Sequence, residues 1–142
     1  MSKKIVLVSC VDEKSITACP ARYLYTSDWF KKAARYAGQI ADEWYILSTK
    51  YGLVHPDQVL DPYNATLKTM KKSARQAWAE RVFASLQSRL SLDDTLVFLA
   101  GQAYREFLVD RLSRLGCKIE IPMEGLRIGE QMQWLNQHMK DS

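Results

Sequence analysis

Four short apolar runs along the chain have the pattern of β-strands. Each is rich in β-branched or aromatic residues, and two are almost continuously apolar, as strands buried on both faces of a sheet tend to be. The four runs are Lys4–Ser9, Trp44–Ser48, Thr95–Leu99 and Lys118–Ile121. Because such runs are typical of parallel sheets, we expect these strands to pair in parallel.

Between and after these runs, apolar residues recur with the period of a helix. Ser27 can cap the first helix, and Gly116 can close the third. The four apolar sets are Phe30, Ala33, Ala34 and Ala37; Met70, Ala74, Ala77, Trp78, Val82, Leu86 and Leu90; Tyr104, Phe107, Leu108, Leu112 and Leu115; and Ile128, Met132, Leu135 and Met139. Strands that alternate with amphipathic helices predict an α/β protein, with residues 1–142 as a single three-layer αβα domain around a mainly parallel central sheet.

Small or polar residues follow each predicted strand. In a parallel sheet the carboxyl ends of the strands share one edge, and ligands bind in the crevice outside them. The segments that would line this crevice are Ser9 to Cys10, Ser48 to Gly52, Ala100 to Tyr104 and Pro122 to Leu126. We therefore expect one ligand site assembled from distant parts of the chain.

Several residues at and near these strand ends are candidates for substrate binding. Glycine bends let backbone N–H groups approach a ligand, although glycine at such bends more often serves the turn alone. Aromatic rings can stack on a flat base or fill the core, and Cys10 fits a small buried hydrophobe better than a catalytic thiol. The candidates are Ser9, Cys10, Tyr25, Ser48, Lys50, Tyr51, Gly52, Tyr63, Asn64, Gly101, Gln102, Tyr104, Gly125 and Arg127.

Two carboxylates are candidates for catalysis. Glu124 follows the last predicted strand, next to Gly125, with no basic residue within two positions. A carboxylate at such a place can act as an acid, a base or a hydrogen-bond acceptor. Asp61 is the second candidate, but the proline that follows it also gives it a turn-making explanation.

Positive charge is concentrated in one segment. The 142 residues carry a net charge of +4. Six Lys and Arg residues against the single acid Glu80 give the segment from Lys68 to Arg89 a charge of +5, which leaves the rest of the chain at −1. Such a stripe can follow the phosphates of a nucleic acid or can be a solvated helix face. The candidate backbone contacts are Lys68, Lys71, Lys72 and Arg75.

Other features of the composition narrow the classes of protein. The three cysteines are irregularly spaced and the chain has only two histidines, so neither a disulfide framework nor a zinc site is supported, and we expect no metal or cofactor. The apolar run at Ile5–Val8 is far too short for a secretory leader or a membrane span. A cytoplasmic protein without a membrane partner is the expectation.

The order of several motifs resembles a family of bacterial and phage domains of unknown function. It is similar, more distantly, to YaaA-type proteins, to the glycosylase-like domain of archaeosine-synthesis enzymes and to the uracil-DNA-glycosylase-like superfamily. The motifs are Ser9 to Cys10, Pro20 to Tyr25, Leu47 to Leu53, Asp61 to Tyr63, Gly101 with Tyr104, and Glu124 to Gln131. The resemblance covers nearly the whole chain and implies a glycosylase-like three-layer α/β fold that handles nucleobases.

Residues and resemblance together favour a DNA glycosylase-like function. An enzyme that cleaves an N-glycosidic bond must extract the nucleotide from the base stack and stabilise an oxocarbenium-like sugar, a task that suits a carboxylate. The expected substrate is a modified or damaged base in DNA, with defence against phages that carry modified DNA as one setting. Two alternatives remain open: a non-catalytic DNA-binding module like the YaaA-type stress proteins, and a protein that binds or hydrolyses a free nucleotide.

Overall fold

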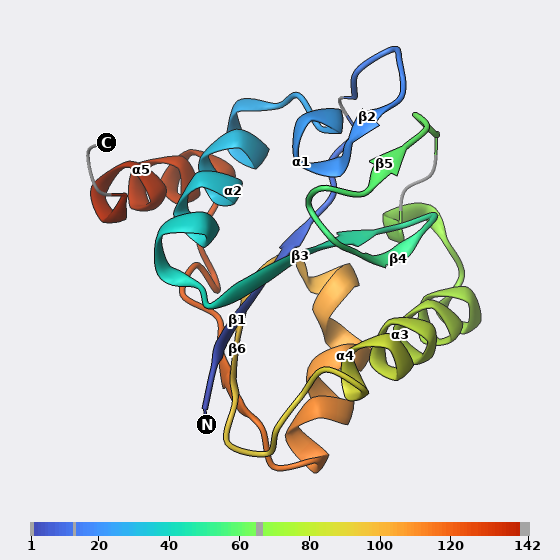
Figure 1. The fold of residues 1–142 in the computed structure, drawn as a ribbon, viewed down its shortest axis with the longest axis vertical. Coiled ribbons are helices and arrows are strands. Elements are labelled where there is room, and N and C mark those ends of the chain that lie inside the picture. Colours follow the sequence, from blue (N-terminus) through green and yellow to red (C-terminus); the bar gives the residue numbers. More distant parts are fainter. Residues whose placement is uncertain (1, 13, 65–66, 140–142) are drawn as a thin grey trace.

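The computed structural model describes residues 2–12, 14–64 and 67–139 and has a central sheet between two layers of helices (Figure 1). The five strands of this sheet are β1 (Lys4–Ser9), β3 (Glu43–Ser48), β4 (Gly52–Val54), β6 (Thr95–Leu99) and β7 (Lys118–Glu120), in the order β4-β3-β1-β6-β7. Strand β1 pairs in parallel with both β3 and β6, and β7 pairs in parallel with β6. The four strands expected from the sequence, and their parallel pairing, are confirmed.

Strand β4 was not expected, and it makes the sheet mixed. It pairs antiparallel with β3 at one edge, with Ser48 opposite Gly52. Gly52 has a φ of +76°, a conformation that a residue with a side chain rarely adopts,. The turn alternative for this glycine therefore has a direct structural basis.

Two helices cover each face of the sheet (Figure 1). Helices α2 (Asp28–Ile40) and α5 (Ile128–His138) pack together on one side, and α3 (Lys72–Gln87) and α4 (Gln102–Arg114) pack together on the other. The Oγ atom of Ser27 accepts a hydrogen bond of 3.1 Å from the backbone N of Phe30, which confirms the predicted cap. Helix α4 ends just before Gly116, whose φ is +93°.

The ends of two helices differ from the prediction. Helix α3 is shorter than its apolar pattern, because Met70 and Leu90 fall outside it. On α5 the side chain of Leu135 is buried as expected, whereas Ile128, the first residue of the helix, is 64% exposed. The apolar face predicted for this helix is therefore wrong at its first position.

Short elements that the sequence did not reveal lie between β1 and α2 and between β4 and α3. Strand β5 (Val59–Leu60) pairs antiparallel with β2 (Cys19–Pro20), and helix α1 (Ala21–Leu24) lies beside them. A single 3-10 turn, η1, follows at Leu67–Thr69. These elements have four residues or fewer, so they are too short to show a periodic pattern.

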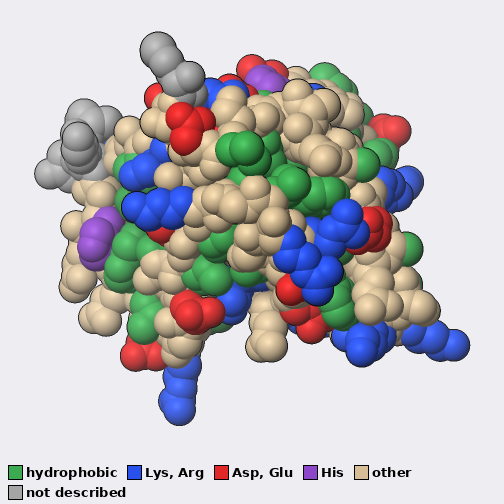
Figure 2. Space-filling model, turned by 90° about the horizontal axis from the view of Figure 1, so that it is seen from below, with side chains coloured by type: hydrophobic (Ala, Val, Ile, Leu, Met, Phe, Trp, Pro, Cys, Tyr) green, Lys and Arg blue, Asp and Glu red, His purple; other side chains and the backbone are tan. Residues whose placement is uncertain are grey.

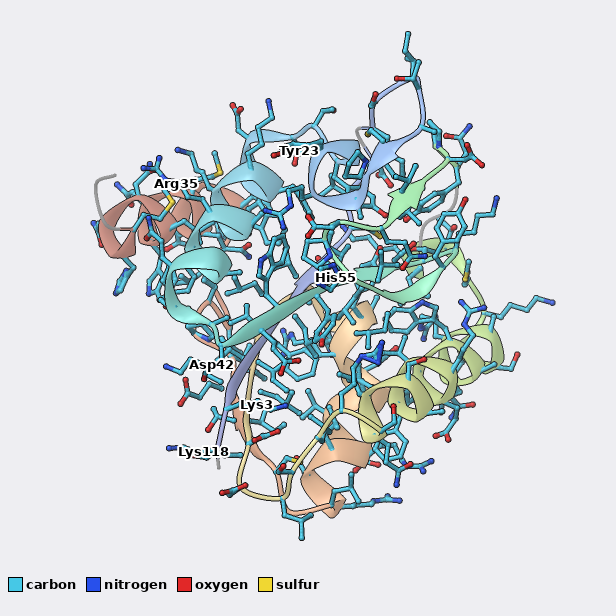
Figure 3. The ribbon with its side chains drawn as sticks, in the orientation of Figure 1. Lys3, Tyr23, Arg35, Asp42, His55 and Lys118 are labelled. Carbon is cyan, nitrogen blue, oxygen red and sulfur yellow. The ribbon has the colours of Figure 1, made fainter. Side chains whose placement is uncertain are left out.

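The core lies around the three central strands. Residues 5–9 of β1 and the last four residues of both β3 and β6 are buried, as expected for strands covered on both faces,. Lys3 and Lys118 mark the amino ends of β1 and β7 at the lower end of the molecule, and Tyr23 marks α1 near the upper end (Figure 3). Within the described residues no helix has the length and apolar character needed to cross a membrane.

Candidate functional site

The larger of two adjoining cavities opens at the carboxyl ends of β1 and β6. Helix α2 follows β1 on one face of the sheet and α4 follows β6 on the other, and ligands of doubly wound sheets bind at such a switch point,. The cavity has a volume of about 640 Å³, which lies within the range of small-molecule sites. Its lining residues are Ser9, Cys10, Val11, Asp12, Ser27, Trp29, Lys68, Gly101, Gln102, Tyr104, Leu126, Arg127, Ile128 and Gln131.

Sequence reasoning found about half of this lining. Six of the predicted substrate-binding residues line the cavity, together with one residue predicted to contact the nucleic-acid backbone. These seven are Ser9, Cys10, Gly101, Gln102, Tyr104, Arg127 and Lys68. Asp12 was not singled out, although it lies just after β1. Trp29 and Gln131 were not singled out, because nothing in the sequence shows that α2 and α5 reach the ends of β1 and β6.

A smaller cavity of about 320 Å³ lies at the ends of β6 and β7. It is lined by Phe98, Ala100, Gly101, Gln102, Arg105, Ile121, Met123, Glu124, Gly125, Leu126 and Gln131. Predicted residues Glu124 and Gly125 belong to this cavity, and Gly125 forms a turn with a φ of +81°. The two cavities share four residues, Gly101, Gln102, Leu126 and Gln131, so they adjoin.

Glu124 has a basic partner that its sequence neighbours do not reveal. Its Oε2 atom lies 3.1 Å from Nη1 of Arg105, on α4. The Nε atom of Arg105 also donates a 3.0 Å hydrogen bond to the carbonyl of Ala100, which fixes the guanidinium. The side chain of Glu124 is 63% exposed. Although no basic residue lies within two positions of it in the sequence, Glu124 is a carboxylate held by a cation at the rim of the smaller cavity.

Asp61 and its neighbours lie elsewhere. The carboxylate of Asp61 lines neither of the two cavities, and its carbonyl accepts a 3.4 Å hydrogen bond from the hydroxyl of Tyr51. Lys50 lies with its Nζ 5.2 Å from the centre of the Tyr51 ring. Asn64 is exposed. The structure therefore does not bring these predicted residues, or Gly52, together with those that line the cavities.

Tyr25, Ser48 and Tyr63 form a buried hydrogen-bonded group that lines neither cavity. The hydroxyl of Tyr63 lies 2.8 Å from that of Tyr25 and 2.9 Å from the Oγ atom of Ser48. The backbone N of Tyr51 donates a 3.0 Å hydrogen bond to the same Oγ atom. Burial raises the pKa of Tyr25 to about 12 and also raises the pKa of Tyr63. These hydroxyls therefore stay neutral. Through Ser48 and Tyr25 they hold Tyr51 and Tyr63, which belong to the segment between β3 and α3, by hydrogen bonds.

A second buried group forms part of the larger cavity. The Sγ atom of Cys10 lies 3.4 Å from both the Oγ1 atom of Thr49 and the hydroxyl of Tyr104. The two oxygens are 3.1 Å apart. Burial raises the pKa of Tyr104, so its neutral hydroxyl can both donate and accept. Thr49 was missed as a site residue, although it directly follows the predicted Ser48.

Only part of the basic segment is available for a phosphate within the described residues. Lys68 lines the larger cavity, and Lys71 and Lys72 are exposed, with no hydrogen bond or ion pair from either side chain to another described residue. Arg75 is already engaged: its Nε atom lies 2.8 Å from Oε1 of Glu106, and its Nη1 atom donates a 2.7 Å hydrogen bond to the carbonyl of Met70. This arginine ties α3 to α4.

Gln131 connects three segments at the boundary of the two cavities. Its Oε1 atom accepts a 2.8 Å hydrogen bond from Nε1 of Trp29, and its Nε2 atom donates a 2.8 Å hydrogen bond to the carbonyl of Leu126. The first bond joins α5 to α2, and the second joins α5 to the loop after β7. Both ends of the amide are thus fixed.

The lining of the larger cavity combines aromatic, amide, thiol and charged side chains. No group of three or more His, Cys, Asp or Glu side chains among residues 2–12, 14–64 and 67–139 could hold a metal ion. Aromatic rings, amides and a thiol line the larger cavity, together with the cations Lys68 and Arg127. Such a mixture can bind a flat ring and an attached anionic group.

The comparisons with known proteins agree with the expected kind of family. A model described as a family of unknown function (DUF6884) matches residues 5–137. Uncharacterized protein YfjM of Bacillus subtilis (strain 168) is 28% identical over 119 residues, with 75% of each chain covered. No solved structure matches the chain significantly. Neither the family description nor this relative links the chain to YaaA-type proteins or to uracil-DNA glycosylases.

Proposed function

The chain belongs to the DUF6884 family of unknown function, and from this premise we propose that it is a DNA glycosylase-like hydrolase. Its reaction is hydrolysis of the N-glycosidic bond of a nucleobase. The observation that carries the proposal is the cavity of about 640 Å³ at the carboxyl ends of β1 and β6. This cavity combines the ring of Trp29, the ring and hydroxyl of Tyr104 and the amide of Gln102. An extruded base needs this combination of a flat apolar surface and convergent polar groups.

Glu124 is the carboxylate that we assign to catalysis. When the bond between the base nitrogen and C1′ breaks, its electron pair leaves with the base and the sugar becomes an oxocarbenium ion. A carboxylate nearby stabilises this cation. Water then adds its oxygen to C1′, and the proton that it releases balances the negative charge on the departing base. Arg105, 3.1 Å from the carboxylate, holds Glu124 at the cavity rim in this scheme.

The proposal carries with it the finer expectations drawn from the sequence. The three-layer fold with a mostly parallel sheet suits a relationship to the uracil-DNA-glycosylase-like superfamily. The substrate is a modified or damaged base in DNA, defence against phage DNA is one setting, and the cytoplasm is the expected location. The exposed side chains of Lys71 and Lys72, which make no hydrogen bond or ion pair to another described residue, support DNA as the partner,.

The direct test is base release. The protein is incubated with unmodified DNA and with DNA that contains modified or damaged bases, and mild alkali then cleaves the strand at abasic sites. We expect cleavage that depends on both the protein and one class of base. DNA that stays intact across the whole panel would contradict the proposal, and retention of DNA without any base release would favour the non-catalytic binding module.

A second candidate function is binding or hydrolysis of a free nucleotide. The observation that favours it is that two cations, Lys68 and Arg127, line the cavity itself. Arg75, from the basic segment, is instead engaged with Glu106 and with the carbonyl of Met70. Two cations suffice for the phosphate of a single nucleotide. Hydrolysis of free nucleotides that is faster than base release from DNA would establish this alternative.

A further inference from the structure

The two adjoining cavities differ in chemistry. The larger one has the rings of Trp29 and Tyr104 and the apolar side chain of Val11 in its lining. The smaller one has an ion pair, Arg105 with Glu124, in a lining that also includes the amide of Gln102. An aromatic lining suits a base, whereas paired charges and amides suit a group that carries several oxygen atoms.

Gln131 lies in the wall that the cavities share. Its oxygen is bonded to Trp29 of the larger cavity, and its nitrogen is bonded to the carbonyl of Leu126, 2.8 Å away in each case. The amide cannot rotate out of this wall without breaking both hydrogen bonds. Its position is therefore set by the protein before any ligand arrives, which is the requirement for a residue that positions a substrate.

We propose that the two cavities form one bipartite site for a base joined to its pentose, with the base in the larger cavity, the pentose in the smaller one and Gln131 as the positioning residue at their boundary. The inference rests on the proposed function, and it adds the substrate unit and its direction. The pentose then lies beside Glu124, which is the arrangement that stabilisation of a sugar cation requires. The Arg105 guanidinium, which lines only the smaller cavity, donates to the sugar oxygens.

The site is mapped by backbone amide chemical shifts of the full chain. The probes are the four DNA bases and 5-hydroxymethylcytosine, each added as the free base and as the 2′-deoxynucleoside, with ligand integrity checked by chromatography. We expect at least one free base to shift amides near Cys10 and Tyr104 alone, and its nucleoside to shift those near Gly125 as well. Free base and nucleoside with the same pattern, or no nucleoside that reaches Gly125, would overturn the inference.

Gln131→Met tests the boundary, since methionine has a similar length but makes neither hydrogen bond. We expect the free base to shift the amides of both cavities in this variant. Gln133→Met is the matched control, because Gln133 is exposed on the same helix and lines neither of the two cavities. Trp29→Phe removes one of the two bonds and leaves the other, so we expect an intermediate pattern. If both Gln131→Met and Trp29→Phe showed the same chemical-shift changes as the unmodified protein, Gln131 would not be the positioning residue.

The experiment separates this inference from the proposed function. Binding across both cavities with no base release from any DNA would leave the bipartite site in place and would exclude hydrolysis. Base release without any shift near Gly125 would support hydrolysis and would exclude the bipartite site. At temperatures below the thermal midpoint of the Gln131→Met variant, and where base release occurs, we expect kcat to fall about tenfold or more while KM changes little.

Discussion

Individual residues show how the same side-chain type takes different roles in this fold. Glu124 and Asp61 were both candidates for catalysis in the sequence, yet only Glu124 lines one of the two cavities. Tyr104 also lines a cavity, whereas Tyr25 and Tyr63 are buried in a group of hydroxyls beneath the surface. The sequence could identify the residue types, but the distinction depends on which loops fold over the strand ends.

Replacement of Glu124 by glutamine tests the catalytic carboxylate. The change keeps the size of the side chain and removes its charge, so we expect base release to fall by on the order of a hundredfold or more. DNA affinity and the thermal midpoint should change little, because the Glu124 side chain is 63% exposed and the glutamine oxygen can still accept a hydrogen bond from Arg105. Base release, affinity and melting are measured on the same preparation.

Asp61→Asn is the comparison for this variant. We expect full base release from it, since the Asp61 carboxylate lines neither cavity. If the folded Glu124→Gln variant kept its activity, the role assigned to Glu124 would be wrong. Asp12, which lines the larger cavity, would then be the next carboxylate to replace.

Tyr63→Phe tests the buried hydroxyls through their pH dependence. Burial raises the pKa of Tyr25 to about 12 from its ordinary value of 10, and it also raises the pKa of Tyr63. Above pH 10 the unfolded chain loses these protons while the folded chain keeps them. The stability is therefore present in full below pH 10 and falls as the pH rises from 10 towards 12, by about 1.4 kcal/mol per pH unit for each tyrosine.

The Tyr63→Phe change should lower the free energy of unfolding at neutral pH and should weaken its dependence on pH above 10. At pH 7 we expect a loss of about 1–3 kcal/mol, because Tyr25 and Ser48 each lose a buried partner,. Above pH 10 the free energy of unfolding should fall less steeply than in the unmodified protein. Urea unfolding between pH 7 and about 11.5 measures both effects, with the exposed Tyr23→Phe as control,. Parallel pH curves for Tyr63→Phe and the unmodified protein would contradict this account.

At the scale of elements, the sequence predicted what has a long periodic signal. The parallel strands β1, β3, β6 and β7 and the helices that flank them were found, together with the cap at Ser27. The antiparallel edge strand β4 and the pair β2–β5 were not found, because strands of two or three residues show no alternation. Most lining residues of the candidate site that lie at the ends of β1 and β6 were predicted from the sequence. Trp29 of α2 and Gln131 of α5 were not, because the packing of these helices beside the strand ends is a tertiary contact that no local pattern shows.

Helix α3 and the residues before it provide the test of DNA backbone binding. Each phosphate contact that is lost should weaken the slope of log K against log salt by about 0.9. We expect the exposed pair Lys71→Ala and Lys72→Ala, changed together, to reduce the slope by nearly two units. Affinity for a DNA duplex is measured over a series of salt concentrations.

Arg75→Ala should behave differently from the two lysines. This arginine is bound to Glu106 and to the carbonyl of Met70, so we expect a lower thermal midpoint and an almost unchanged slope. Lys118→Ala is the control for charge alone, since Lys118 lies at the amino end of β7, away from the strand ends that carry the cavities. Equal slopes for all of these variants would show that the basic segment is solvated surface.

At the scale of the whole molecule, one face can be compared with the position of the cavities. Seen from below, Lys and Arg side chains lie among Asp and Glu side chains (Figure 2), and the net charge is only +4. The cavities instead lie at the carboxyl ends of the strands, opposite the amino ends marked by Lys3 and Lys118 (Figure 3). Under the proposed function, we therefore expect recognition to depend on the base in the cavity more than on long-range attraction to the DNA backbone.

If recognition of the base outweighs attraction to the DNA backbone, the rates of base release should follow a definite order among substrates. A base that must leave a matched duplex costs a few kcal/mol of unpairing and unstacking, and each 1.4 kcal/mol of that cost lowers the rate about tenfold. We therefore expect the target base to be released at least about tenfold faster from a single strand or a mispaired duplex than from a matched duplex. The free deoxynucleoside pays no extrusion cost but lacks every backbone contact, so we expect it to react more slowly than the single strand. Single-turnover rates on the four substrates, with the target base held constant, give the order directly. Equal rates on matched and mispaired duplexes would mean that extrusion does not limit the reaction, and a free nucleoside or nucleotide that reacts fastest would make the protein an enzyme of free nucleotides.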